Sequence, residues 1–247
     1  MKMNKNKIVI VTGATRGIGL AITKTLLRKD IAVHMIARDS QELKRVSALL
    51  KKYAKLTYSP LDLSSREEIN RFCSKWNKYI WGIVNNAGRW AEERIDEPPK
   101  GVWDPIMRLN VDGVYSFTKG MQKWILSGGR IVNISSQLGT SGRAGMGAYA
   151  ASKHAVIGLT KCWALELSHR KITVNAVCPG WVDTYSNKAE IQEWAKEAGI
   201  SYTARKKQIS EQLPLKRFIK PEEVANFVLF LIEPEASGIT GQAYEIK

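Results

Sequence analysis

Tyr149 and Lys153 lie four positions apart and could transfer a proton together. A tyrosine hydroxyl has an ordinary pKa of about 10, which is too high for easy proton exchange at neutral pH. On a helix, a lysine four residues later lies on the same face, so its ammonium would stabilise the phenolate and lower the tyrosine pKa. Such a pair predicts a proton donor for a carbonyl oxygen whose carbon accepts a hydride.

Two other pairs share this spacing, so the spacing alone does not identify the proton donor. Tyr149 differs from the other tyrosines because small residues surround it and Ser136 lies thirteen positions upstream. Tyr115 stands in an apolar helical pattern, which predicts a structural role, and Tyr202 stands in a stretch that reads as a polar loop. The three pairs are Tyr115/Lys119, Tyr149/Lys153 and Tyr202/Lys206.

A glycine-rich segment, Thr12-Gly-Ala-Thr-Arg-Gly-Ile-Gly19, lies between an apolar run and an amphipathic stretch. Gly13 and Gly17 would let the backbone approach a pyrophosphate, and Gly19 would let a helix pack tightly on a sheet. The N-terminus of that helix supplies amide donors and the positive end of a dipole. The segment predicts a dinucleotide site.

The end of the second predicted strand bears on the choice of cofactor. An acid there would accept hydrogen bonds from the adenosine ribose and repel a 2′-phosphate. The sequence instead has Ala37 followed by Arg38, and Arg16 lies in the glycine loop. Two guanidiniums can clamp a phosphate, so we predict NADPH rather than NADH. Asp39 is the counterargument, because it could pair with Arg38.

Strand-like and helix-like segments alternate along the chain, which predicts one doubly wound α/β domain of Rossmann type spanning residues 1–247. Its parallel sheet would carry helices on both faces and bind ligands at the carboxyl ends of the strands. A capping box, Ser64-x-x-Glu67, predicts the start of the third helix. The expected strands are 7–12, 31–37, 55–60, 79–85, 130–135, 173–178 and 239–246, and the other expected helices are 17–29, 40–53, 100–126 (with a break near Pro105), 148–168 and 221–232.

The cysteine and histidine counts, the apolar runs and the net charge narrow the class of protein further. Three widely spaced cysteines and scattered histidines predict reduced thiols, a cytoplasmic location and no catalytic metal. No apolar run is long enough for a membrane span. The net charge of +15 would attract anions, but the lysines form no block and no nucleic-acid motif occurs. We therefore expect an acidic partner or an anionic substrate and no nucleic acid, although charge alone would also suit a nucleic-acid binder.

Together, these pieces resemble the short-chain dehydrogenase/reductase family over nearly the whole chain. The resemblance implies that Tyr149 is the general acid, that Ser136 orients the substrate carbonyl, and that Lys153 tunes Tyr149 and binds ribose. It further implies that Asn110 holds a water in a proton relay. The resemblance rests on the glycine loop, Asp62-Leu63, Asn85-Asn-Ala-Gly88, Asn110, Ser136-x-x-Gly139, Tyr149/Lys153 and Pro179-Gly180.

The same resemblance assigns the cofactor contacts. Asp62 would contact adenine, residues 86–88 would line the nucleotide and residues 179–184 would cover the nicotinamide. The cofactor residues expected for NADP(H) are Gly13, Thr15, Arg16, Gly17, Ile18, Gly19, Arg38, Asp62, Leu63, Asn86, Ala87, Gly88, Tyr149, Lys153, Pro179, Gly180, Val182 and Thr184.

Departures from the family pattern suggest the substrate. Arg89 and Trp90 stand where the family usually has an aliphatic residue, Arg143 precedes Tyr149, and Trp181 could add an aromatic wall. Residues 184–215 would form a substrate lid, or else a surface loop without a role in specificity. Similar family members reduce 3-oxoacyl thioesters on acyl carrier protein or coenzyme A.

Other functions remain open at this point. A small anionic ketone or hydroxy acid is the alternative substrate, and a cofactor-sensing regulator is the alternative without enzyme activity. The resemblance also implies a homodimer or a homotetramer.

Overall fold

Short β-branched runs become the strands of one parallel sheet in the computed structural model, which describes residues 7–247. Such runs suit strands that are buried on both faces. The strand order is β3-β2-β1-β4-β5-β6-β7, and every neighbouring pair is parallel. The strands are β1 (Ile8–Thr12), β2 (Ala32–Ala37), β3 (Leu56–Pro60), β4 (Ile80–Asn85), β5 (Ile125–Ile134), β6 (Thr173–Pro179) and β7 (Ala243–Ile246).

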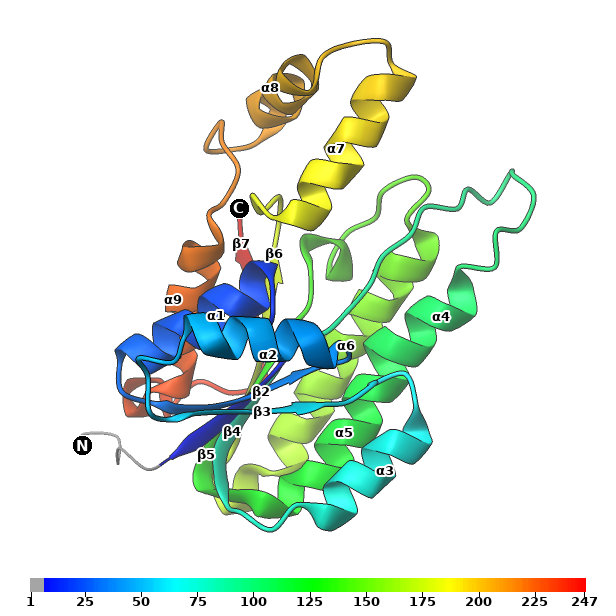
Figure 1. Cartoon of the computed structure of the whole chain (residues 1–247). Coiled ribbons are helices and arrows are strands. Elements are labelled where there is room, and N and C mark those ends of the chain that lie inside the picture. Colours follow the sequence, from blue (N-terminus) through cyan, green and yellow to red (C-terminus); the bar gives the residue numbers. More distant parts are fainter. Residues whose placement is uncertain (1–6) are drawn as a thin grey trace.

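Helices cover both faces of this sheet, which confirms the predicted doubly wound α/β fold (Figure 1). Each face holds its own apolar core, because the strands send side chains alternately to the two sides. One face carries α1 (Gly17–Arg28), α2 (Ser40–Leu49) and α9 (Pro221–Ile232), and the other carries α3 (Arg66–Lys75), α4 (Trp103–Met107), α5 (Val114–Met121) and α6 (Gly147–Glu166).

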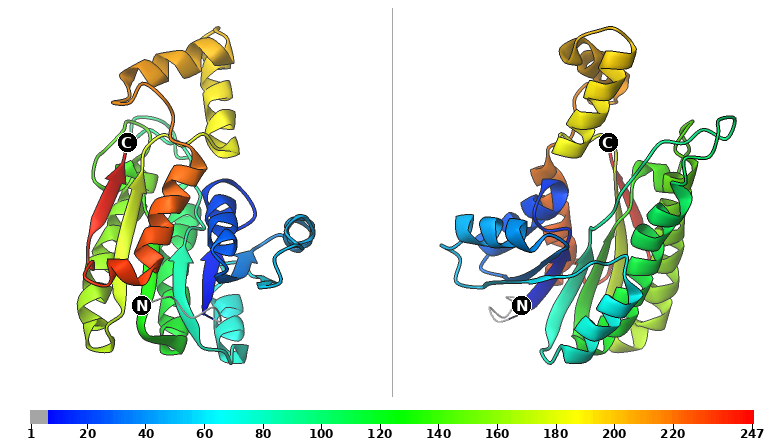
Figure 2. Two further views of the ribbon diagram at one scale, coloured as in Figure 1. Left: turned by 90° about the vertical axis from the view of Figure 1, so that its left-hand side faces the viewer. Right: turned by 45° about the vertical axis from the view of Figure 1, so that its right-hand side comes forward.

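The chain reverses its direction of strand addition at β1, which has β2 on one side and β4 on the other. In open α/β sheets, ligands bind beyond the carboxyl ends of the strands at such a switch point. Two further helices, α7 (Tyr185–Glu197) and α8 (Tyr202–Gln212), project beyond this same edge (Figure 2).

The predicted helix over 100–126 is wrong in its continuity. The structure has α4, a π-helical segment (Arg108–Gly113), α5, a 3₁₀ turn (Gln122–Trp124) and then the first residues of β5. Pro105 does not break α4, because it lies in the first turn, where a missing amide hydrogen costs little. The irregularity lies instead in the π-helical segment.

Two further local predictions are wrong. The cap of α3 is shifted by one residue, because Ser65 accepts a hydrogen bond from the amide of Glu68 at 3.2 Å. The carboxylate of Glu68 in turn accepts from the amide of Asp62 at 3.0 Å. Tyr202 begins α8 instead of lying in a loop. Within residues 7–247, no helix has the length and apolar character needed to cross a bilayer.

Candidate active site

The first turns of α6 place Tyr149 and Lys153 on one face, at the carboxyl edge of the sheet. The Lys153 ammonium donates to the carbonyl of Ile134 at 2.9 Å and lies 5.6 Å from the centroid of the Tyr149 ring. Burial lowers the pKa of Lys153 to about 8. The lysine is therefore anchored to the end of β5 beside the tyrosine.

Ser136 follows β5 and faces Tyr149. Burial raises the pKa of the Tyr149 hydroxyl, while its hydrogen bond with Ser136 opposes that shift. The Ser136 oxygen also accepts from the amide of Leu138 at 3.1 Å, which fixes its position. Two hydroxyls thus converge on the point where a substrate oxygen would need proton and hydrogen-bond donors.

Asn110 lies in the π-helical segment and is 1% exposed. Its side-chain amide donates to the carbonyl of Arg89 at 2.8 Å and to the hydroxyl of Ser152 at 3.0 Å. Its side-chain oxygen accepts from the amide of Arg89 at 2.9 Å. Asn110 therefore fastens the segment after β4 to α6, next to Tyr149. Single-turn π segments inside helices are frequent at functional sites.

Ser136, Tyr149 and Lys153 line one cavity of about 160 Å³. Most of its walls were predicted as site residues, but three were missed. Ser135 could have been found as the strand-end neighbour of Ser136, whereas Ile134 and Asn187 carry no distinguishing signal in the sequence. The lining residues are Ile18, Asn86, Gly88, Arg89, Trp90, Ile134, Ser135, Ser136, Tyr149, Lys153, Pro179, Gly180, Val182, Thr184 and Asn187.

The glycine loop has the shape of a phosphate cradle. Gly13 and Gly17 adopt positive φ angles of 62° and 53°, which favour glycine. A Cβ on Gly19 would stand 2.2 Å from the carbonyl oxygen of Gly13, so only glycine lets α1 start this close to the loop. No side chain caps the N-terminus of α1 at Arg16, so its first amides remain available to an anion. The loop therefore fits a dinucleotide pyrophosphate.

Residues 86–88, directly after β4, hold the glycine loop in place through hydrogen bonds. The Thr12 hydroxyl accepts from the amides of Asn86 at 2.9 Å and Ala87 at 3.0 Å. The Asn86 side chain donates to the carbonyls of Thr12 at 2.9 Å and Gly13 at 3.2 Å. These bonds place the glycine loop and residues 86–88 on opposite sides of one groove.

The arginines predicted to bind phosphate are both exposed. Asp39 does not pair with Arg38, because its carboxylate caps α2 by accepting from the amides of Gln41 and Glu42. Within residues 7–247, neither Arg16 nor Arg38 forms an ion pair.

The positive charge of Arg38 acts on the carboxyl group of Asp62. Burial raises the pKa of Asp62, but hydrogen bonds from Ser64 and the charge of Arg38 outweigh burial and hold it below its ordinary value. Thr15 and Leu63, the other predicted residues at this end, are both buried.

The described residues 7–195 match the family model for short chain dehydrogenase. The chain belongs to the short-chain dehydrogenase family. It is 36% identical to the 3-oxoacyl-(acyl-carrier-protein) reductase FabG of Thermotoga maritima, over 98% of this chain and 96% of that protein. It is 31% identical to the D-beta-hydroxybutyrate dehydrogenase of Cupriavidus necator, over 99% of this chain and 97% of that protein.

Among solved structures, a variant of actinorhodin polyketide ketoreductase with NADPH is similar, with a TM-score of 0.90 and 33% sequence identity. That similarity covers 100% of this chain and 97% of the ketoreductase. The short-chain dehydrogenase described here is therefore an oxidoreductase that acts on C=O and CH–OH groups. Its residues 7–247 contain no group of three or more side chains suited to hold a metal ion.

The four predicted substrate residues of this short-chain dehydrogenase lie in different settings. Arg89 and Trp90 line the cavity, and within residues 7–247 no acid pairs with the exposed Arg89 side chain. Trp181 packs edge-on against Trp194, with 5.7 Å between ring centroids. Arg143 is not free to bind a substrate anion, because its guanidinium lies 2.8 Å from a carboxylate oxygen of Glu190.

Proposed function

We propose that this enzyme is an NADPH-dependent ketoreductase and that its substrate is a 3-oxoacyl thioester of acyl carrier protein or coenzyme A. The observation that carries the proposal is the convergence of Ser136, Tyr149 and Lys153 in one cavity beside the glycine loop. The FabG relative and the ketoreductase with NADPH support the substrate class and the cofactor.

The chain's own groups would divide the work as follows. Bound NADPH supplies the hydride. The Ser136 hydroxyl donates a hydrogen bond to the ketone oxygen, and the Tyr149 hydroxyl donates the proton that this oxygen gains on reduction. The Lys153 ammonium stabilises the resulting phenolate and binds ribose. Asn110, fixed by three hydrogen bonds, holds a water that returns a proton.

The cofactor would lie along the groove between the glycine loop and residues 86–88, with Asp62 at the adenine and residues 179–184 over the nicotinamide. The first amides of α1 receive the pyrophosphate, and Arg16 and Arg38 receive the 2′-phosphate. Within one domain of residues 1–247, residues 184–215 would form the lid. The three free thiols, at Cys73, Cys162 and Cys178, agree with a cytoplasmic enzyme. A homodimer or homotetramer is part of the same proposal.

A small anionic ketone or hydroxy acid is the second candidate substrate. The D-beta-hydroxybutyrate dehydrogenase relative and the free guanidinium of Arg89 favour it. In that case, Arg89 would bind the carboxylate directly. A charge-assisted hydrogen bond contributes about 1.5–3 kcal/mol, so Arg89→Ala would lower kcat/KM by about ten- to a hundredfold.

Oxidation of NADPH with acetoacetyl-coenzyme A and with acetoacetate tests the proposal. We expect the thioester to be reduced with a higher kcat/KM than the acid, and Arg89→Ala to change the thioester rate little. Faster turnover of acetoacetate, lost in Arg89→Ala, would instead establish the second candidate. If no ketone is reduced, the ketoreductase proposal is wrong.

A further inference from the structure

Glu190 is a buried carboxylate that the proposed reaction does not use. It lies on α7 and is only 5% exposed. Burial raises its pKa, and the charge of and hydrogen bond from Arg143 oppose that shift. Arg143 comes from the segment that leads into α6, and its guanidinium donates to Glu190 at 2.8 Å. A carboxylate is costly to bury unless a cation compensates it, so these two groups depend on each other.

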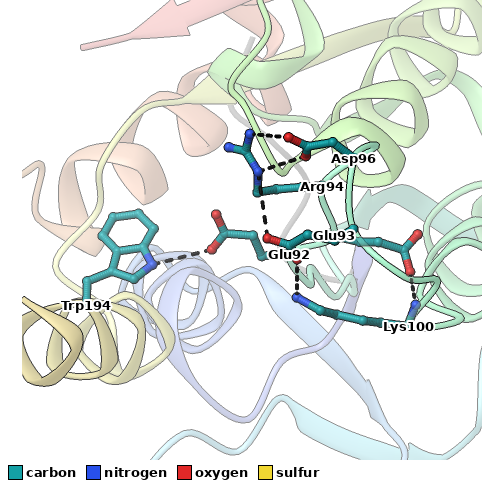
Figure 3. A network of polar contacts seen from close by, with 7 residues as sticks. Glu92, Glu93, Arg94, Asp96, Lys100 and Trp194 are labelled. Atoms are coloured by element: carbon teal, nitrogen blue, oxygen red, sulfur yellow. Dashed lines mark hydrogen bonds and ion pairs between the residues drawn. The ribbon is translucent and has the colours of Figure 1, made fainter.

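Two tryptophans fix the orientation of this guanidinium. Arg143 lies 5.3 Å from the ring centroid of Trp181 and 5.0 Å from that of Trp194. Trp194 in turn donates a hydrogen bond of 3.4 Å to Glu92, which lies in the segment after β4 (Figure 3). The indole faces attract the cation while the carboxylate occupies one edge of its fork.

This ion pair lies within electrostatic reach of the reacting hydroxyl. The negative charge of Glu190 raises the pKa of Tyr149 and the positive charge of Arg143 lowers it, with Glu190 the stronger of the two. The other groups that face Tyr149 are Ser136, through its hydroxyl, and Lys153, through its ammonium. The helix that bears Glu190 begins directly after Thr184, which lines the cavity. Neither Arg143 nor Glu190 lines the cavity, so the pair lies outside it, near Tyr149 and the Thr184 end of α7.

On the basis of the proposed function, we propose that Glu190 sets the charge specificity of the cavity by neutralising Arg143 just outside it. An unpaired guanidinium there would attract a carboxylate attached near the ketone. With Glu190 in place, such a carboxylate would meet a second, buried negative charge and would have to share the arginine with it. A 3-oxoacyl thioester carries no charge near its ketone, whereas a 3-oxo acid does. Glu190 is thus a specificity residue that acts through Arg143.

Glu190→Gln tests this inference, because glutamine keeps the shape of the side chain and removes its charge. The substrates are acetoacetate and the neutral N-acetylcysteamine thioester of acetoacetate, each with NADPH. We expect Glu190→Gln to raise kcat/KM for acetoacetate by about tenfold or more, the effect of one gained charge-assisted contact, while the thioester value changes by less than about threefold. Adding Arg143→Gln should remove the gain.

The matched control is Glu193→Gln, an exposed glutamate on the same helix, which should leave both values unchanged. A purely structural role for Glu190 would lower both values together. That result overturns the inference, and so does an unchanged ratio of kcat/KM for acetoacetate to kcat/KM for the thioester.

Binding supplies a readout that does not depend on turnover. Acetoacetate titrated into the complex with the oxidised cofactor NADP⁺, which has no hydride to transfer, should bind more tightly to Glu190→Gln than to the parent, as followed by the fluorescence of the tryptophans around Arg143. The parent's rate with the thioester tests the proposed function, and the effect of Glu190→Gln on the ratio and on acetoacetate affinity tests the inference. A parent that reduces the thioester but whose ratio and anion affinity do not respond to Glu190→Gln overturns the inference alone.

Discussion

The Tyr149 hydroxyl is subject to opposing influences, since burial raises its pKa and Ser136 and Arg143 lower it. Tyr149→Phe removes only that hydroxyl. We expect it to abolish turnover and to leave NADPH affinity nearly unchanged, because the ring and Lys153 remain. Steady-state rates and an NADPH binding titration are the measurements.

Two other tyrosines provide controls for this substitution. The Tyr115 hydroxyl contacts Lys119 at 3.3 Å at an exposed position, and Tyr202 lies on α8. Tyr115→Phe and Tyr202→Phe should keep most of the activity. Near-normal turnover in Tyr149→Phe would show that another group donates the proton.

Arg16 and Arg38 provide the second prediction at the residue scale. Because Asp39 is occupied as the cap of α2, both guanidiniums are available to a 2′-phosphate. We expect NADPH to be preferred over NADH by at least about tenfold in kcat/KM, which corresponds to about 1.4 kcal/mol. Ala37→Asp combined with Arg38→Ala should reverse the order. A parent enzyme that prefers NADH would contradict the prediction.

At the scale of elements, the start of α1 depends on Gly19. A Cβ there would stand 2.2 Å from the carbonyl oxygen of Gly13 and 2.5 Å from the Asn86 side-chain nitrogen. Gly19→Ala should therefore weaken NADPH binding and lower the free energy of unfolding by about 1–3 kcal/mol. Gly238→Ala is the control, because a Cβ at Gly238 meets nothing within 4 Å. Equal NADPH affinities in the two variants would refute this account.

His34 joins β2 to its neighbours. Its Nδ1 lies 2.8 Å from the Thr57 hydroxyl on β3, and its ring packs edge-on against Trp76, with centroids 4.9 Å apart. Burial first, and then the charge of Lys78, lowers the pKa of His34 to about 4. Its other ring nitrogen has no hydrogen-bond partner in the described part of the chain. The folded protein thus favours neutral His34.

This shift predicts a pH-dependent stability. Between about pH 6.5 and 4, the unfolded chain binds a proton at His34 that the folded chain does not bind. The contribution of neutral His34 to the free energy of unfolding is complete above pH 6.5. It is lost as the pH falls, and the loss reaches about 3 kcal/mol at the acid end of this window. Denaturant unfolding across this range should show a shallower pH slope for His34→Gln than for the parent. The exposed His154→Gln should retain the parent slope, and identical slopes in all three proteins would exclude His34 as the cause.

The sequence predicts elements better than it predicts contacts between them. The central strands β1, β4 and β6 coincide with buried runs that are visible in the sequence, and Pro221 starts α9 at the predicted residue, because these signals are local. The π-helical segment around Asn110 was missed, since residues 108–113 have no distinctive composition. The polar neighbours of Tyr202 predict a loop, yet Ser201 caps a helix there.

In the candidate site, too, the sequence predicts residues with local signals but not the contacts between distant segments. Ser136, Tyr149 and Lys153 are predictable because each stands at a strand end or on one helix face, and parallel strands bring their carboxyl ends together. The pairing of Arg143 with Glu190 is not predictable, since 47 positions separate them and the two tryptophans that flank the arginine are also distant in sequence.

For the whole molecule, the net charge of +15 predicts how substrates arrive. An acidic carrier protein would be steered toward this surface, whereas a small neutral thioester would not. Between about 0.01 M and 1 M salt the Debye length falls from about 30 Å to about 3 Å. Over that range, kcat/KM for a carrier-bound 3-oxoacyl thioester should fall by about tenfold or more. The N-acetylcysteamine thioester should change little, and parallel salt curves for the two would argue against steering.

The tryptophan-flanked ion pair limits how this enzyme can be recombined with its relatives. Glu190 and Trp194 lie on α7, but Arg143 precedes α6 and Glu92 follows β4. The amide of Glu93 also donates to the carbonyl of Gly145 at 2.8 Å, which ties those two segments together. A chimera that exchanged only residues 184–215 would bring in a new Glu190 and Trp194 but keep the old Arg143 and Glu92, so these contacts would join unmatched partners. A workable transplant must therefore move three separate stretches of sequence as one cassette.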